Sequence, residues 1–147
     1  MLHYQLNYLT KSKLISFDIN KLFNQVVKLV QQEMKLDIDL WFDVVIVNEK
    51  RMQEINHKFR HKNQVTDVIT FAFWDNQMIK TQLLGEIYLC PEFINKVAIE
   101  QQMTFKQNFA LNFIHGLLHL FQFDHMNEKD AKLMFSKQQK IFERLKI

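Results

Sequence analysis

The chain is poor in the residues that favour turns or form disulfide cross-links: among 147 residues there are two glycines, one proline and one cysteine. A single cysteine, Cys90, excludes an internal disulfide and suits a reducing compartment. Neither a hydrophobic leader segment nor an apolar run long enough to span a membrane is visible. We therefore expect a soluble, cytoplasmic protein without a membrane segment.

Composition and charge are those of an ordinary globular protein. Hydrophobic residues make up 48% of the chain and charged residues 24%, which argues against global disorder. The length suits one domain with a real core, so we expect residues 1–147 to form a single domain. The net charge of +3 is compatible with a polyanionic partner, and equally with a solvated lysine-rich surface.

Hydrophobic periodicity and capping residues divide the chain into alternating strands and helices. Strands are expected over residues 2–8, 40–47, 66–73 and 83–90, and the last two form a hairpin across a polar loop at 75–82. Helices are expected over residues 18–34, 48–58, 92–101, 104–121 and from 127 onward. This order predicts an α+β fold, a small mixed β-sheet packed with about five helices. The helix that ends near Phe121 is apolar on almost every side, which predicts a buried central helix.

Three of the six histidines lie close together at the end of that helix. His115 and His119 are one helical turn apart, so both imidazoles should project from the same face. In a continuous helix His125 would point about 120° away from His119. The helix must therefore end near Phe121 if the chain is to bring His125 back to the other two.

Three neutral imidazoles suit Zn²⁺ and leave its fourth position open for water or substrate. The spacing predicts a metal centre held by His115, His119 and His125, with one Zn²⁺ or another divalent transition metal per chain. An open site favours catalysis over a purely structural role, because structural zinc sites use four protein ligands. The alternative is three unrelated histidines on the helix surface or in the core.

The histidine spacing resembles the metzincin protease motif H-E-x-x-H-x-x-G-x-x-H. Here Gly116 follows the first histidine in place of the glutamate that serves as the general base. The missing base argues against peptide hydrolysis.

Residues 115–125 resemble more closely the H-G-x-L-H-L-x-G-Y-D-H signature of the bacterial YbeY family, metal-dependent endoribonucleases that mature ribosomal RNA. Upstream, residues 56–60 and 66–71 resemble that family's N-x-x-x-R and T-D-V-L-S-F segments, and residues 84–89 resemble its L-G-D-I-x-I strand. The match runs from about residue 44 to the C-terminus, with the motifs in the family's order. The resemblance implies a single-strand-specific endoribonuclease that is zinc-dependent and acts on ribosomal RNA and ribosomal particles. It leaves the oligomeric state open.

The chain departs from the signature after the helix, where Gln122 and Phe123 replace glycine and tyrosine, and Glu86 replaces an aspartate. Glycine would permit a left-handed residue at the helix end, and glutamine in that conformation costs roughly 1 kcal/mol. We expect the turn to be preserved at this cost. Asp124 either orients a metal-bound imidazole or caps the turn.

The resemblance implies two catalytic residues, Arg60 and His115. The guanidinium of Arg60 could stabilise charge on the scissile phosphate; the alternative is a surface arginine paired with a carboxylate. Arg60 belongs to a basic cluster that could follow an RNA backbone, formed by Lys58, Arg60, His61 and Lys62. Thr66 and Asp67 are expected to anchor a turn, Gly85 to permit close backbone packing, and Cys90 to be a small buried hydrophobe.

Two other functions remain open from the sequence. One is a metal-dependent protease or amidase with an unusual base. The other is a non-catalytic ribosome-assembly factor in which the metal only fixes the fold.

Overall fold

The computed structural model describes residues 1–74, 81–123 and 127–147. The strands are β1 (Leu2–Tyr8), β2 (Leu40–Ile46), β3 (Val68–Ala72) and β4 (Leu83–Leu89). The helices are α1 (Ile19–Met34), α2 (Glu49–Arg60), α3 (Pro91–Glu100), α4 (Phe105–Leu120) and α5 (Glu128–Glu143). This is the predicted succession of elements, and the α+β fold is confirmed.

The strands form one mixed sheet in the order β1-β2-β4-β3. β1 runs parallel to β2 and β2 parallel to β4, whereas β3 is antiparallel to β4, with Ile69 opposite Tyr88. The predicted pairing of β3 with β4 is thereby confirmed, although residues 75–80 of the expected hairpin loop lie outside the described residues.

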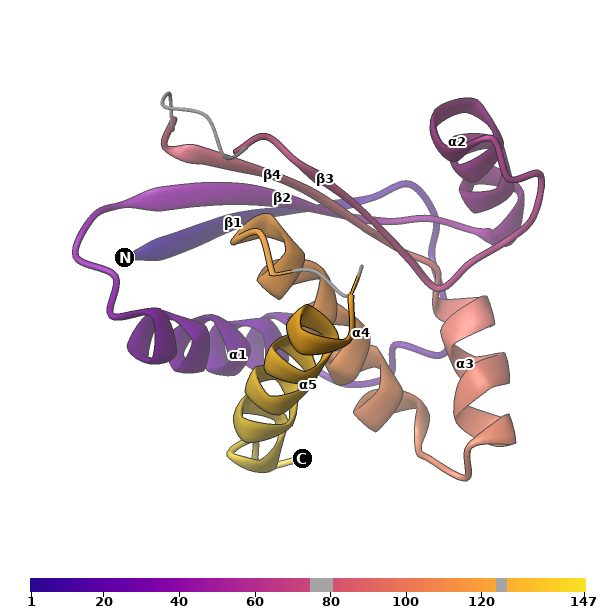
Figure 1. The fold of residues 1–147 in the computed structure, drawn as a ribbon. Coiled ribbons are helices and arrows are strands. Elements are labelled where there is room, and N and C mark those ends of the chain that lie inside the picture. The colour runs from indigo at the N-terminus through magenta and orange to yellow at the C-terminus, as the bar shows by residue number, and fades with distance from the viewer. Residues whose placement is uncertain (75–80, 124–126) are drawn as a thin grey trace.

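Helices cover the two faces of the sheet unequally (Figure 1). α1, α4 and α5 lie on one face, and α2 lies on the other face near one end. The main core fills the space beneath the sheet, where the fully buried Phe23 and Phe113 stack with their ring centroids 4.0 Å apart. Burying such a ring contributes about 1.5–3 kcal/mol. A second, smaller core lies under α2 and consists of Val45, Val47, Met52, Ile69 and Cys90.

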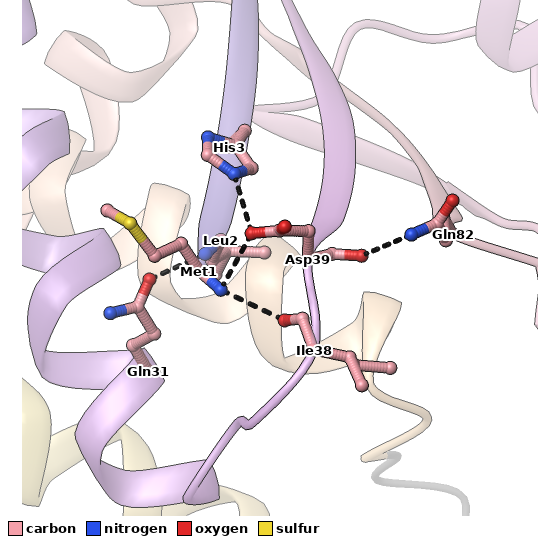
Figure 2. A network of polar contacts seen from close by, with 7 residues as sticks. All are labelled: Met1, Leu2, His3, Gln31, Ile38, Asp39 and Gln82. Atoms are coloured by element: carbon pink, nitrogen blue, oxygen red, sulfur yellow. Dashed lines mark hydrogen bonds and ion pairs between the residues drawn. The ribbon is translucent and has the colours of Figure 1, made fainter.

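A network of polar contacts fixes the start of β1 to the segment before β2 (Figure 2). The amino group of Met1 contacts the carbonyl oxygen of Ile38 at 3.0 Å and Oδ1 of Asp39 at 3.1 Å. Nε2 of His3 lies 3.1 Å from the same carboxylate oxygen, and the His3 ring stacks on Trp41. The hydrogen bond from His3 is the main reason that the pKa of the Asp39 carboxyl lies below its ordinary value. These contacts hold β1 in register with β2.

In the part of the chain that the structure describes, four residues at or just beyond helix ends adopt a left-handed conformation, and none of them is glycine. They are Lys35, His61, Gln102 and Gln122, with φ between 52° and 69°. Each costs about 1 kcal/mol relative to glycine. The two glycines lie inside β4 and α4, where close packing requires them.

The observed boundaries differ from the predicted ones by a few residues. α2 extends to Arg60, two residues beyond the expected end at residue 58, so Arg60 is helical and does not lie in the connection to β3. β3 begins at Val68, because the Asp67 side chain accepts the backbone N–H of Val68 and ends the preceding turn. In the described part of the chain no helix is long and apolar enough to cross a membrane.

Candidate metal centre on helix α4

The histidine pair lies on α4, whose start and burial are fixed by the sequence. Thr104 and Gln107 form the predicted capping box: the Thr104 hydroxyl accepts the Gln107 backbone N–H, and the Gln107 side chain accepts the Thr104 N–H, both at 3.1 Å. The helix is buried on most sides, as predicted, since ten of its sixteen residues are buried. Its histidines are only partly buried and lie on the open side.

His115 and His119 project from the same face of α4, as the spacing predicted. Their Nε2 atoms are 3.1 Å apart, and the two rings are nearly perpendicular at 83°. The Nδ1 atom of His115 lies 2.9 Å from Oε1 of Gln138 on α5. An amide oxygen only accepts, so this contact places the His115 proton on Nδ1 and leaves the Nε2 lone pair directed toward His119.

This donor pair fits a transition-metal ion. Two nitrogen ligands of a tetrahedral zinc ion, each about 2.0–2.1 Å from the metal, lie roughly 3.3 Å apart, close to the observed 3.1 Å. The hydrogen bond to Gln138 is of the kind that orients metal-bound imidazoles. The third predicted ligand, His125, lies outside the described residues, as does Asp124. Within residues 1–74, 81–123 and 127–147 no cluster of three or more metal-ligating side chains occurs, so the three-histidine site stays a prediction.

The end of α4 turns as the histidine spacing requires. Gln122 has φ of 69°, which confirms the predicted left-handed residue. Its backbone N–H donates to the His119 carbonyl at 2.8 Å, and the Phe123 N–H donates to the Leu118 carbonyl at 3.1 Å. This pair of bonds is a Schellman motif, normally built around glycine. The Gln122 Nε2 atom is buried and has no hydrogen-bond partner among the described residues, so glutamine carries a second cost here.

Both glycines hold α4 close to the sheet. A Cβ atom on Gly116 would lie 2.9 Å from Cγ2 of Ile87 and 3.2 Å from Oγ1 of Thr70. Gly85 has φ of 147°, and a Cβ there would collide with the Phe71 carbonyl oxygen and the Leu120 side chain. The predicted role of Gly85 in close packing agrees with this geometry.

Two cavities flank His115. One, of about 260 Å³, is lined by Asp67, Val68, Val97, Gln101, Asn108, Leu111, Asn112, His115 and Gln138. The other, of about 500 Å³, lies between α4 and α5 and is lined by His115, Glu128, Ala131, Lys132, Met134, Phe135 and Gln138. His115 and Gln138 form the wall between them, so a molecule bound in either cavity lies beside the candidate metal centre.

Arg60 is exposed at the end of α2, on the sheet face opposite α4, and lines neither of these cavities (Figure 1). Residues 61–67 connect it to the cavity wall at Asp67. The basic cluster of Lys58, Arg60, His61 and Lys62 is exposed throughout. The catalytic assignment of Arg60 stays a prediction.

The remaining sequence predictions concern structural residues. Oδ1 of Asp67 accepts hydrogen bonds from the Thr66 hydroxyl and the Val68 N–H, in agreement with a turn anchor. Cys90 is fully buried, and burial raises the pKa of its thiol to about 12, so it remains a protonated, unreactive apolar group. Glu86 is partly buried on β4, opposite Phe71.

Three polar residues of the site were missed from the sequence: Asn108, Asn112 and Gln138. Asn108, Asn112, His115 and His119 follow one another at intervals of four, three and four residues, which is the spacing of one helix face. This stripe of polar residues on an apolar helix was the available signal. Gln138 gave no local signal, because it reaches His115 from another helix, 23 residues further along the chain.

The fold and the site define an α+β protein with a pair of convergent histidines on the open side of a buried helix. The family model of Endoribonuclease YbeY matches residues 5–146, so the resemblance extends well beyond residues 44–147. The chain belongs to this family of endoribonucleases.

Relatives of the chain carry the same description. An Endoribonuclease YbeY from Ureaplasma parvum serovar 3 is 38% identical over 143 residues, which is 91% of this chain and 92% of the relative. Another from Thermotoga maritima is 34% identical over 126 residues, 84% of this chain and 81% of the relative. The solution structure of TM1509 from Thermotoga maritima is similar with a TM-score of 0.66 and 33% identity, covering 97% of this chain and 87% of that one.

Proposed function

We propose that the chain is a metal-dependent endoribonuclease that cuts single-stranded RNA during the maturation of ribosomal RNA. The observation that carries the proposal is the convergence of two imidazole Nε2 atoms, 3.1 Å apart, in a chain that belongs to an endoribonuclease family. The proposal includes ribosomal particles as partners and the cytoplasm as the place of action.

His115, His119 and His125 would hold the metal ion, for which Zn²⁺ is the first choice and another divalent transition metal the second. When bound, the ion would supply Lewis acidity and activate a water molecule. Gln138 fixes the tautomer of His115, because its amide oxygen accepts the Nδ1 hydrogen, and Nε2 would then be the atom that binds the metal. His115 is therefore central to the site, because it lines both cavities and also belongs to the pair of histidines that would bind the metal.

Arg60 and the surrounding basic cluster would bind the RNA backbone. A guanidinium can hold two phosphate oxygens at once and stabilise the charge that develops during cleavage. The exposure of Arg60 leaves its side chain accessible to such a polyanion. RNA in contact with Arg60 would follow residues 61–67 to reach the histidines.

Metal analysis combined with a cleavage assay tests this function. The purified chain should contain about one divalent ion and should cut unstructured RNA only when no chelator is present. His119→Ala should lose both the metal and the cleavage. His57→Ala, which removes an exposed histidine of α2, is the matched control and should keep both. Equal metal content in the wild type and His119→Ala would exclude the assignment.

The same preparations separate the two other functions. Cleavage of an unstructured peptide in place of RNA would identify a protease or amidase. Binding of ribosomal particles that is unaffected by His115→Ala, together with no cleavage by the wild type, would identify an assembly factor. Cleavage of RNA alone supports the endoribonuclease.

A further inference from the structure

The smaller of the two cavities beside His115 has the chemistry of a recognition pocket. Its volume of about 260 Å³ lies just below the range of complete small-molecule pockets, about 300–1,000 Å³. Apolar walls come from Val68, Val97 and Leu111, and its polar groups are mostly neutral amides. A flat, uncharged group with hydrogen-bonding edges would fit such a site better than a phosphate would.

The orientation of the Asn112 side chain is fixed by α4. Asn112 is only 8% exposed, and its Nδ2 donates to the Asn108 carbonyl at 2.9 Å. Because that carbonyl can only accept, the amide cannot be reversed, and Oδ1 is the outward atom. Within the described residues Oδ1 accepts no hydrogen bond, and the atom is not fully shielded from solvent. Asn112 therefore presents an acceptor to the cavity that it lines.

Asp67 and Gln138 complete the pattern. Oδ1 of Asp67 is used by Thr66 and Val68, whereas Oδ2 accepts no hydrogen bond within the described ranges. Gln138 uses Oε1 toward His115, so its Nε2 group is left as a donor. Asp67 and Asn112 thus present acceptors to the cavity and Gln138 presents a donor, while the amide of Gln101, which also lines the cavity, can serve as either.

We propose that this cavity holds one unstacked base of the RNA, and that Asp67 and Asn112 select bases that carry an exocyclic amino group. Single-stranded RNA is read by hydrogen bonds to the edges of splayed bases. An amino group donates to the two acceptors, while a ring nitrogen or carbonyl accepts from Gln138. Uracil lacks an amino group and would place a carbonyl oxygen against the carboxylate. This inference rests on the proposed function for the nature of the ligand.

Binding of uncleavable RNA tests the inference apart from catalysis. Short fluorescent 2′-O-methyl oligomers of adenosine, cytidine and uridine are titrated with the wild-type chain, and their integrity is verified afterwards. The wild type should bind the adenosine and cytidine oligomers about tenfold more tightly than the uridine oligomer, the effect of about one hydrogen bond to a charged group.

Asp67→Asn is the decisive variant. The asparagine oxygen can still accept from Thr66 and Val68, while its NH₂ group replaces the outward acceptor with a donor. The ratio of the affinity for the adenosine or cytidine oligomer to that for the uridine oligomer should fall to about one, or reverse in favour of uridine. Asn112→Leu, which keeps the side-chain volume, should reduce the preference without reversing it. Asp43→Asn changes a carboxylate of β2 that does not line the cavity, and it should leave the preference intact. Thermal melting confirms that each variant is folded.

The outcomes separate this inference from the proposed function. Equal binding of all three wild-type oligomers, no binding of any, or an unchanged preference in Asp67→Asn would overturn the base pocket, even if the enzyme cuts RNA. A preference that Asp67→Asn abolishes would support the pocket, even if the wild type cuts no RNA and the proposed function fails.

Discussion

The Nδ1 atom of His115 and the side-chain oxygen of Gln138 lie 2.9 Å apart and join α4 to α5 across 23 residues of sequence. The contact orients the imidazole and fixes its tautomer. Gln138→Leu should therefore weaken metal binding by about tenfold to a hundredfold, the usual effect of losing such a partner. Gln138→Glu should keep the affinity, because a carboxylate accepts the same hydrogen. Competition with a chromogenic chelator measures the metal affinity of both variants. Equal affinity of Gln138→Leu and the wild type would contradict the role of Gln138 in orienting His115.

The left-handed turn at Gln122 predicts that Gln122→Gly is stabilising or close to neutral. Glycine removes a backbone cost of about 1 kcal/mol and also a buried amide nitrogen that has no partner in the described ranges, against some loss of side-chain packing. Thermal melting should show an unchanged or higher midpoint. Gln102→Gly, which makes the same replacement at the end of α3, is the control away from the site. A midpoint several degrees below that of the wild type would show that the glutamine side chain stabilises the turn.

Gly116→Ala should destabilise the chain by about 1–3 kcal/mol, the usual cost of overpacking. The added methyl group would lie 2.9 Å from Cγ2 of Ile87, so α4 or β4 must shift. Lys132→Ala, on the exposed side of α5, is the control and should change the unfolding free energy little. Denaturant unfolding measures both variants. Full stability of Gly116→Ala would mean that the side chains around the glycine can move aside without cost.

Glu33 on α1 bonds to Lys137 and Lys140 on α5, with Nζ to carboxylate distances of 3.4 and 3.1 Å. The hydrogen bond from Lys140 is the largest cause that lowers the pKa of Glu33 below its ordinary value of 4.5. A carboxyl with a lowered folded-state pKa contributes stability above about pH 4.5, and this contribution is lost as the pH falls through the folded-state pKa.

Glu33→Gln should accordingly lower the unfolding free energy at neutral pH by at most about 1 kcal/mol. The difference from the wild type should disappear in acid. Urea unfolding across this pH range tests the prediction, with Glu54→Gln on the exposed face of α2 as the control. A difference that persists unchanged below the folded-state pKa would rule out the ion pairs as its source.

Arg60→Ala should leave the fold and the metal content intact while RNA cleavage falls by about a hundredfold to a thousandfold, the cost of losing a group that stabilises developing charge. Arg60→Lys should recover only part of the rate. Single-turnover cleavage at saturating enzyme and two salt concentrations measures the effect, with Arg51→Ala as the control on the same helix. A rate at saturation within a few-fold of the wild type, combined with weaker binding that low salt restores, would make Arg60 a surface contact for RNA.

Local signals in the sequence were sufficient to predict the helices and strands and to place the histidine pair on one helix face. Capping residues marked the starts of helices, as Thr104 with Gln107 does for α4, and the four-residue spacing placed His115 and His119 on one face. The left-handed conformation of Gln122 was expected because this residue stands where the family signature has glycine. Each of these features depends on residues within one or two helical turns.

Features that depend on tertiary packing could not be read from the sequence. The order of the strands, with β4 between β2 and β3, has no local signature beyond the pairing of β3 with β4. Gln138 meets His115 only because α5 packs on α4, and the cavity at Asp67 exists only once α3, α4 and β3 are assembled. The start of β3 also shifted, since the Asp67 side chain competes for the backbone N–H of Val68.

The strand order sets a constraint on the folding pathway. Within the described residues β1 pairs only with β2, and β3 pairs only with β4, so the sheet becomes continuous when β4 docks beside β2. That step closes a loop of about forty residues, and the contacts made on docking must offset the entropy of loop closure. We expect β4 docking to limit the folding rate. Substitutions at the β2–β4 interface, such as Val44→Ala, would then slow refolding, whereas substitutions in α5 would mainly accelerate unfolding.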